Sequence, residues 1–122
     1  MDRTLIKPLF IILLILSSLQ AEPKPFNNEI QHLLEYVENE HCTYIRNGDA
    51  HDSKDARKHI QRKYDYFEDD IESTEDFIRL SATESTMFGN KYYIQCKNKP
   101  KVLSSKWLLD ELARYRKSHK GK

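Results

Sequence analysis

SKDARKHIQRKYDYFEDDI, residues 53–71, is the segment that constrains the fold most strongly. Its apolar residues recur at steps of three or four positions, which places them along one face of a helix. These residues are Ala56, Ile60, Tyr64, Phe67 and Ile71. The spacing predicts a helix from Asp52 or Ser53 to about Ile71. The opposite face is expected to be solvated and carries Lys58, Arg62, Asp65, Asp69 and Glu72.

Three further helices are expected around this segment. The first follows Asn27 or Asn28, the second follows Ser73, and the third begins at Ser104 or Ser105, because these polar side chains can cap a helix. Ser73 also has an acid three residues later, as in a capping box. Each segment has apolar residues at helical spacing: Ile30, Leu33, Leu34 and Val37 in the first, Phe77, Ile78 and Ala82 in the second, and Trp107, Leu108, Leu112 and Tyr115 in the third.

Short segments between these helices are typical of strands. Residues 92–96 alternate between two faces, and residues 102–103 can return as a partner strand after a turn at residues 98–101. Residues 42–45 are rich in β-forming side chains and end near Asn47-Gly48, which is a strong turn signal. We therefore predict an α+β, mostly helical fold, with about four helices around one core and a small two-stranded antiparallel hairpin.

Residues 1–21 differ in composition from the rest of the chain. A basic start precedes an unbroken apolar run over residues 9–16, and small or polar residues then lead to Ala21. This order is typical of a secretory signal peptide cleaved after Ala21. As a membrane anchor the run is too short, because a spanning helix needs about 20 apolar residues. We expect a periplasmic or secreted protein with one small globular domain over residues 22–122, in which residues 117–122 fray.

Two cysteines, Cys42 and Cys96, lie in the part that would be exported. An exported chain meets an oxidising compartment, so a disulfide is expected. It would stabilise the fold by an amount on the order of 4 kcal/mol. The alternative is a zinc site formed by His41, Cys42, His51 and Cys96, although no Cys-x-x-Cys or His-x-x-x-His pair supports it. We expect the disulfide, and neither a metal nor a cofactor.

Charge is balanced over the whole chain, at a formal +1, but unevenly distributed. Residues 22–96 carry 9 cationic and 16 acidic residues, whereas residues 97–122 carry 9 and 2. This basic end is expected to be a solvated helix end, and the alternative is weak contact with an anionic membrane surface. The residues concerned are Arg114, Arg116, Lys117 and Lys120. Nucleic acid is not an expected partner, because the basic stretch is short and no binding motif accompanies it.

The order of several short motifs is similar to that in a known family. The motifs are Arg46-Asn47-Gly48, Ala56, His59-Ile60, Lys63, Thr74-Glu75-Asp76-Phe77-Ile78, Ser81-Ala82, Ser85, Gly89 with Tyr92 and Ile94, and Trp107-Leu108. Spread over nearly all of residues 22–122, they resemble the YfeK-like family of small exported bacterial proteins of unknown function. One turn differs, because Gly89-Asn90-Lys91-Tyr92 stands where the family has Gly-x-Pro-Tyr. The resemblance implies a bacterial envelope location and a compact domain, and it supplies no activity.

The best candidate site lies around the longest predicted helix. His59 and Lys63 are four residues apart and therefore share a helix face. Arg46 precedes a tight turn that can fold back over them, and Asp49 follows that turn. Such a cluster could bind an anionic ligand through charge-assisted hydrogen bonds. The structural alternative is that Arg46 holds a loop while His59 is hydrogen-bonded at the edge of the core.

The chain contains residue types used in catalysis but no motif that arranges them. With only three glycines it has no glycine-rich loop for a nucleotide phosphate. A small hydrolase using His59 with Ser81 or Ser85 is the alternative, but neither serine lies in a Gly-x-Ser-x-Gly turn. We therefore predict a non-catalytic binding or interaction module of the bacterial cell envelope. Its partner would be an envelope protein or a small anionic ligand.

Overall fold

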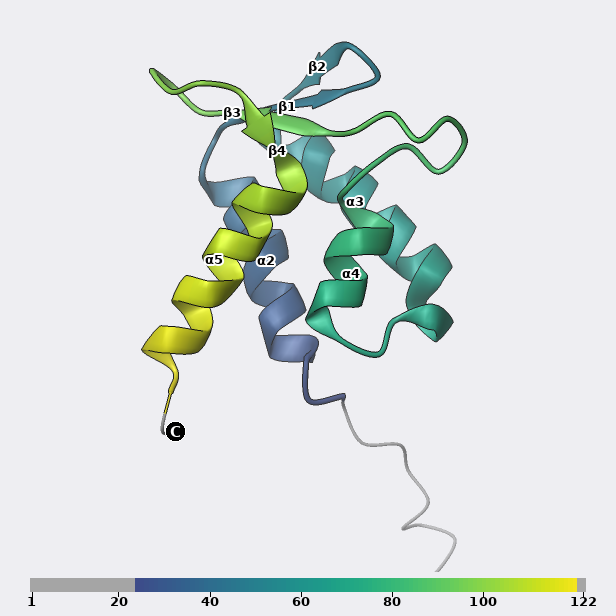
Figure 1. Cartoon of the computed structure of the whole chain (residues 1–122), viewed down its shortest axis with the longest axis vertical. Helices are drawn as coiled ribbons and strands as arrows, with labels where there is room; N and C mark the ends of the chain where they lie inside the picture. The colour runs from purple at the N-terminus through teal and green to yellow at the C-terminus, as the bar shows by residue number, and fades with distance from the viewer. Residues whose placement is uncertain (1–23, 121–122) are drawn as a thin grey trace, which may run out of the picture.

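A computed structural model describes residues 24–120 of the chain. In chain order the elements are α2 (Asn27–Asn39), β1 (Thr43–Arg46), β2 (Asp49–His51), α3 (Ser53–Phe67), the short 3-10 helix η2 (Glu68–Asp70), α4 (Thr74–Ser81), β3 (Tyr93–Gln95), β4 (Val102–Leu103) and α5 (Ser104–Ser118). The sheet lies across one end of the helices (Figure 1). The predicted signal peptide and its cleavage point lie outside the described residues.

The fold is α+β and mostly helical, as predicted, but its sheet has four strands rather than two. The strand order is β2-β1-β3-β4 and every pair is antiparallel. Asn47 and Gly48 join β1 to β2 with φ angles of 52° and 82°, and a two-residue hairpin turn of this type needs both to be positive. β2 is only three residues long and has no buried side chain, so no alternating apolar pattern indicates it in the sequence.

The long helix begins where the sequence predicts and ends earlier. The carboxylate of Asp52 accepts a hydrogen bond of 2.9 Å from the backbone N–H of Asp55, which caps α3. The α-helix ends at Phe67, and Glu68–Asp70 form a 3-10 turn. Three consecutive acids at a helix C-terminus oppose the helix dipole, which accounts for the early end. Ile71 is nevertheless buried, as its spacing predicts.

Capping was predicted correctly at one of the other three helices. The hydroxyl of Ser73 accepts from the N–H of Asp76 at 3.0 Å and caps α4. α2 starts after Phe26 and α5 starts after Leu103, and neither of these helices has a side-chain cap. Ser104 instead donates to the hydroxyl of Tyr44 inside the core, because this serine is fully buried.

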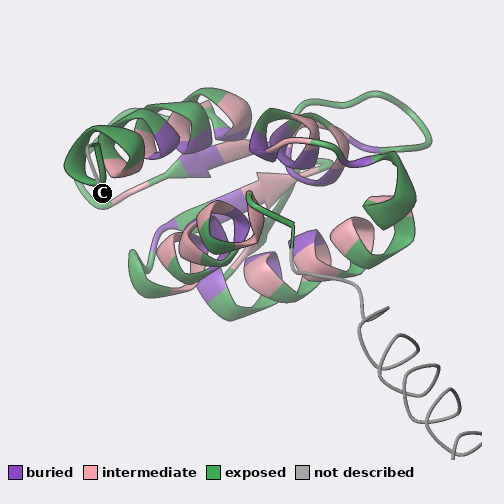
Figure 2. Ribbon diagram, turned by 90° about the horizontal axis from the view of Figure 1, so that it is seen from below, coloured by how far each residue is buried: buried purple, intermediate pink, exposed green. Residues whose placement is uncertain are grey.

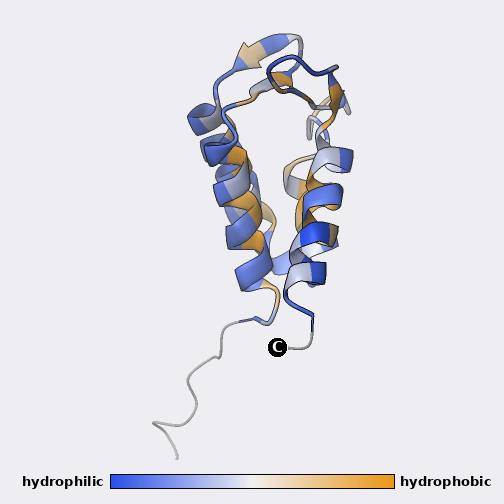
Figure 3. Ribbon diagram, turned by 90° about the vertical axis from the view of Figure 1, so that its left-hand side faces the viewer, coloured by the Kyte–Doolittle hydropathy of each residue, from blue (hydrophilic) through white to orange (hydrophobic). Residues whose placement is uncertain are grey.

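The core lies between two pairs of helices and under the sheet. In Figure 1, α2 and α5 are on one side and α3 and α4 on the other. Buried residues line the inward faces of these helices (Figure 2), and the same faces are hydrophobic (Figure 3). The predicted stripe on α2 is confirmed, since Ile30, Leu33, Leu34 and Val37 are all buried. None of the helices within residues 24–120 is long and apolar enough to cross a membrane.

A disulfide and a set of ion pairs connect parts of the fold that are distant in the sequence. Cys42 and Cys96 form the predicted disulfide, next to Thr43 and Gln95, which pair where β1 begins and β3 ends. At the far end of the helices, Arg116 on α5 donates to the carboxylates of Glu29 and Glu75 at 2.8–3.1 Å. The predicted solvated basic end therefore begins beyond Arg116, because this side chain joins α5 to α2 and α4.

Candidate functional site

Arg46 is carried to the candidate site by the β1–β2 hairpin. It is the last residue of β1, and the tight turn at Asn47-Gly48 follows it directly. Its guanidinium reaches the imidazole of His59 on α3, with Nη1 in contact with Nδ1 and 3.3 Å from Nε2. The expectation that Arg46 folds back onto the helix is met by this contact.

The hydroxyl of Tyr92 contacts both His59 and Lys63, the two site residues predicted on one helix face. Nε2 of His59 lies 3.1 Å from the Tyr92 hydroxyl, and Nζ of Lys63 lies 3.5 Å from the same oxygen. Lys63 also donates to the backbone carbonyl of Glu84 at 2.7 Å and sits 5.2 Å from the centre of the Tyr92 ring. We call Arg46, His59, Lys63 and Tyr92 the basic cluster.

The hydrogen bonds of the basic cluster determine the tautomer of His59. Arginine only donates, so Nδ1 of His59 must accept from Arg46 and the neutral ring must carry its proton on Nε2. Nε2 then donates to Tyr92 Oη. Burial, together with the charges of Arg46 and Lys63, lowers the pKa of His59 to about 4. His59 is therefore neutral at pH 7, and the charge of the cluster comes from Arg46 and Lys63.

A small cavity of about 190 Å³ opens beside the basic cluster. Besides Arg46 and His59, its walls include the cationic side chains of Lys58 and Arg62, and His51 from β2. Asp55 is the single carboxylate among its described lining residues. Burial lowers the pKa of Lys63, which contacts Tyr92 but does not itself line the cavity. The arrangement offers several N–H donors and a net positive charge to a small anion.

Not all of the predicted site residues come together. Asp49 pairs with Arg46 across the hairpin but is exposed, and it does not line the cavity. Ser81 is fully buried with no hydrogen-bond partner for its hydroxyl, and Ser85 accepts from the N–H of Phe88. The hydrogen-bond partners of His59 within residues 24–120 are Arg46 and Tyr92. The structure thus provides no hydrogen bond along which His59 could take a proton from either serine.

The predicted zinc alternative is not compatible with the disulfide. Cys42 and Cys96 are bonded to each other, and a zinc site needs thiolates. Among residues 24–120, no group of three or more His, Cys, Asp and Glu side chains is placed to hold a metal ion.

Among the basic side chains that line the cavity, His51, Lys58 and Arg62 were not predicted as parts of an anion site, and His51 had been considered only as a zinc ligand. Lys58 and Arg62 had been assigned to a solvated helix face. They are four residues apart, so they form a second basic pair beside His59 and Lys63 on α3. Five of the seven residues in 57–63 are basic, which is the signal that would have indicated them. His51 has no such signal, because β2 itself was not predicted.

Comparison with known proteins agrees with the resemblance seen in the motifs. Over 50 residues, the chain is 36% identical to the uncharacterized protein YfeK of Salmonella typhimurium strain LT2. That match covers 41% of this chain and 42% of the relative. No solved structure matches the chain. A family model described as a family of unknown function, DUF5329, matches residues 24–116. Because this match takes in all of the described secondary structure except the end of α5, the chain belongs to the DUF5329 family.

Proposed function

We propose that this protein is an exported, non-catalytic binding module whose ligand is a small oxoanion, such as phosphate. One observation carries the proposal, which is the convergence of cationic side chains on the 190 Å³ cavity beside the basic cluster. Arg46 and Arg62 are the two guanidinium groups there, and guanidinium groups bind oxoanions through pairs of N–H donors.

The size of the cavity supports a small ligand. Pockets for drug-sized molecules are about 300–1,000 Å³, and this cavity is smaller. A nucleotide or a long peptide would not be enclosed in it. An ion with three or four oxygen atoms could instead meet Arg46, Arg62 and Lys58 at the same time.

The basic cluster is also held ready for an anion before one binds. Arg46 is oriented by His59, and His59 is oriented by Tyr92, so little side-chain freedom would be lost on binding. A nearby negative charge also favours the imidazolium form of His59, and protonation at Nδ1 removes the acceptor for Arg46 and so releases that N–H group to the anion. We therefore expect phosphate to raise the pKa of His59.

Titration with inorganic phosphate, followed by calorimetry and by ¹⁵N-edited NMR, tests this proposal. Arg46→Met should weaken phosphate binding by about tenfold or more, since it removes a charge-assisted contact. Arg57→Met is the matched control, because Arg57 is on the same helix but pairs with Glu38 away from the cavity. Equal affinities for both variants, or no binding of phosphate, sulfate or acetate by the unaltered protein, would overturn the proposal.

Export is the second part of the proposal. It is supported by the signal-peptide pattern over residues 1–21 and by the Cys42–Cys96 disulfide, which oxidising compartments favour. Intact mass of the protein from a cell-envelope fraction tests it, with and without reductant. We expect a chain that starts at Glu22. Its cysteines should react with a thiol-blocking reagent only after reduction. An uncleaved chain with free thiols would contradict export.

A further inference from the structure

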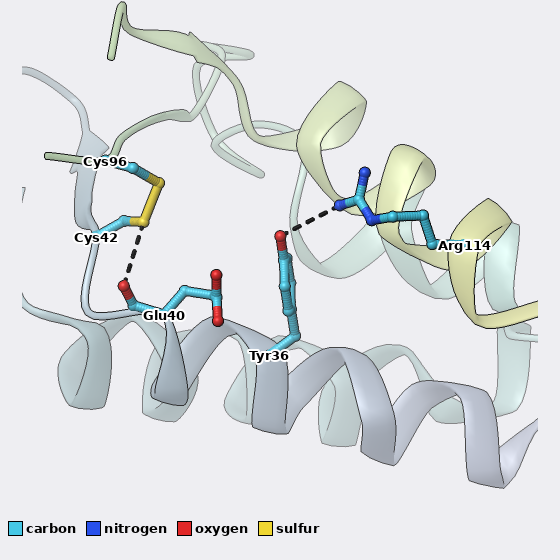
Figure 4. The surroundings of a disulfide bond; sticks show 5 residues. All are labelled: Tyr36, Glu40, Cys42, Cys96 and Arg114. Carbon is cyan, nitrogen blue, oxygen red and sulfur yellow. Dashed lines mark hydrogen bonds between the residues drawn. A yellow bond between two sulfur atoms is a disulfide. The ribbon is translucent and has the colours of Figure 1, made fainter. Parts of the chain in front are cut away.

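A larger groove lies beside the disulfide, away from the basic cluster. Its volume is about 470 Å³, and its walls come from α2, β3, β4, α5 and the turn between β3 and β4. Figure 4 shows part of it, with Tyr36 rising from α2 toward α5 and with the disulfide on the other side of Glu40. Its volume falls within the range of about 300–1,000 Å³ that is typical of small-molecule sites.

The inner wall of the groove is apolar and partly aromatic. Tyr36 and Trp107 pack with their ring centres 4.4 Å apart. Ile94, Val102 and the disulfide continue this surface. Tyr36 is held in place by Arg114, which donates to its hydroxyl at 3.3 Å. A flat or aliphatic molecule could therefore bury its apolar surface here.

The rim of the groove is cationic. Four cationic and two acidic residues line it, and two of the cations are already paired: Lys106 with Asp110 at 2.8 Å, and Arg114 with Glu111 at 2.8 Å. Lys97 and Lys99, in the β3–β4 turn, form no ion pair with any carboxylate among residues 24–120. The carboxylate of Glu40 also lines the groove and forms no ion pair among residues 24–120, so the groove combines an apolar wall with a net positive charge.

We propose that this groove binds a small amphipathic acid, with its apolar body against Trp107 and its acid group at Lys97 and Lys99. The complementarity of charge favours an acid over a neutral or cationic molecule. The site shares no lining residue with the cavity at the basic cluster, so this inference is independent of the proposed oxoanion site.

Trp107 provides a direct readout because it is the only tryptophan in the chain. Decanoate, kept below its micelle-forming concentration, should shift the Trp107 emission to shorter wavelength in a saturable way. Decyltrimethylammonium has the same apolar chain and the opposite charge, and it should bind at least about tenfold more weakly. Inorganic phosphate should leave the emission unchanged, since the phosphate site proposed above is elsewhere.

A double variant tests the position of the acid group. Lys97→Gln with Lys99→Gln should weaken decanoate binding by about fivefold, which corresponds to two exposed charge contacts. Lys101→Gln with Lys120→Gln is the matched control, because it removes the same charge from residues outside the groove. NMR shifts on adding decanoate should gather at residues 96–107. An equal response to both detergent-like ions, equal affinities in both double variants, or shifts spread over the whole protein would overturn the proposal.

Discussion

Nζ of Lys63 donates a hydrogen bond of 2.7 Å to the backbone carbonyl of Glu84, which joins α3 to the segment that follows α4. The same ammonium group lies 3.5 Å from the Tyr92 hydroxyl, which in turn is bonded to His59. One half-buried lysine thus holds three separate segments of the chain at the basic cluster. The cluster is part of the framework of the fold as well as a candidate binding site.

Replacing Lys63 should therefore reduce stability. Lys63→Met keeps the aliphatic stem but removes the donor, and it leaves the Glu84 carbonyl without this bond. We expect the free energy of unfolding to fall by about 1.5–3 kcal/mol, as for other hydrogen bonds that involve a charged group. Urea denaturation measures it. Lys58→Met, on an exposed position of the same helix, should change stability by less than about 0.5 kcal/mol.

His59 should make stability depend on pH below neutrality. Its pKa is about 4 in the folded protein and 6.5 in an unfolded chain, so between these values the unfolded state binds more protons. Stability is therefore lost as the pH falls from 6.5 toward 4, and His59 adds no further loss below that. His59→Gln should lose less stability than the unaltered protein between pH 7 and pH 5. Parallel pH profiles of the two proteins would contradict the low pKa.

Arg116 should contribute to stability through its two carboxylate partners. Their hydrogen bonds to Arg116 lower the pKa values of Glu29 and Glu75. Arg116→Met should reduce the free energy of unfolding by about 1 kcal/mol, because the pairs are partly exposed. Lys117→Met is the neighbouring control and should have little effect. In 1 M NaCl the difference between the two variants should shrink, and a difference that persists there would show that packing rather than charge is lost.

Removal of the disulfide should have the largest effect of these changes. Cys42 and Cys96 are 54 residues apart, and a cross-link over a loop of this length stabilises a fold by about 4 kcal/mol in the chain-entropy model. Cys42→Ser with Cys96→Ser should lower the free energy of unfolding by about that amount. Reduction of the unaltered protein should reproduce the loss. If only the serine variant loses stability, the cause is the substitution and not the missing cross-link.

The helices could be predicted from the sequence because hydrophobic periodicity is a local signal. The disulfide could be predicted because the number of possible pairings is small. The stripe Ile30, Leu33, Leu34 and Val37 and the buried residues Ala56 and Ile60 follow from helical periodicity alone. With two cysteines only one pairing within the chain exists. His59 and Lys63 could be placed on one helix face for the same reason of spacing.

The sheet and the composition of the candidate site were decided by tertiary structure. β1 pairs with β3 through backbone hydrogen bonds, so the side chains of one strand do not indicate which strand it pairs with. β2 is too short and too polar to show an alternating pattern. The β1–β3 pairing brings Tyr92, the residue before β3, to His59, and the β1–β2 hairpin adds His51 to the cavity wall. Asp49 was excluded by the same hairpin, which leaves it exposed outside the cavity. Local periodicity determined which residues of this protein face inward, whereas long-range strand pairing determined which polar residues meet.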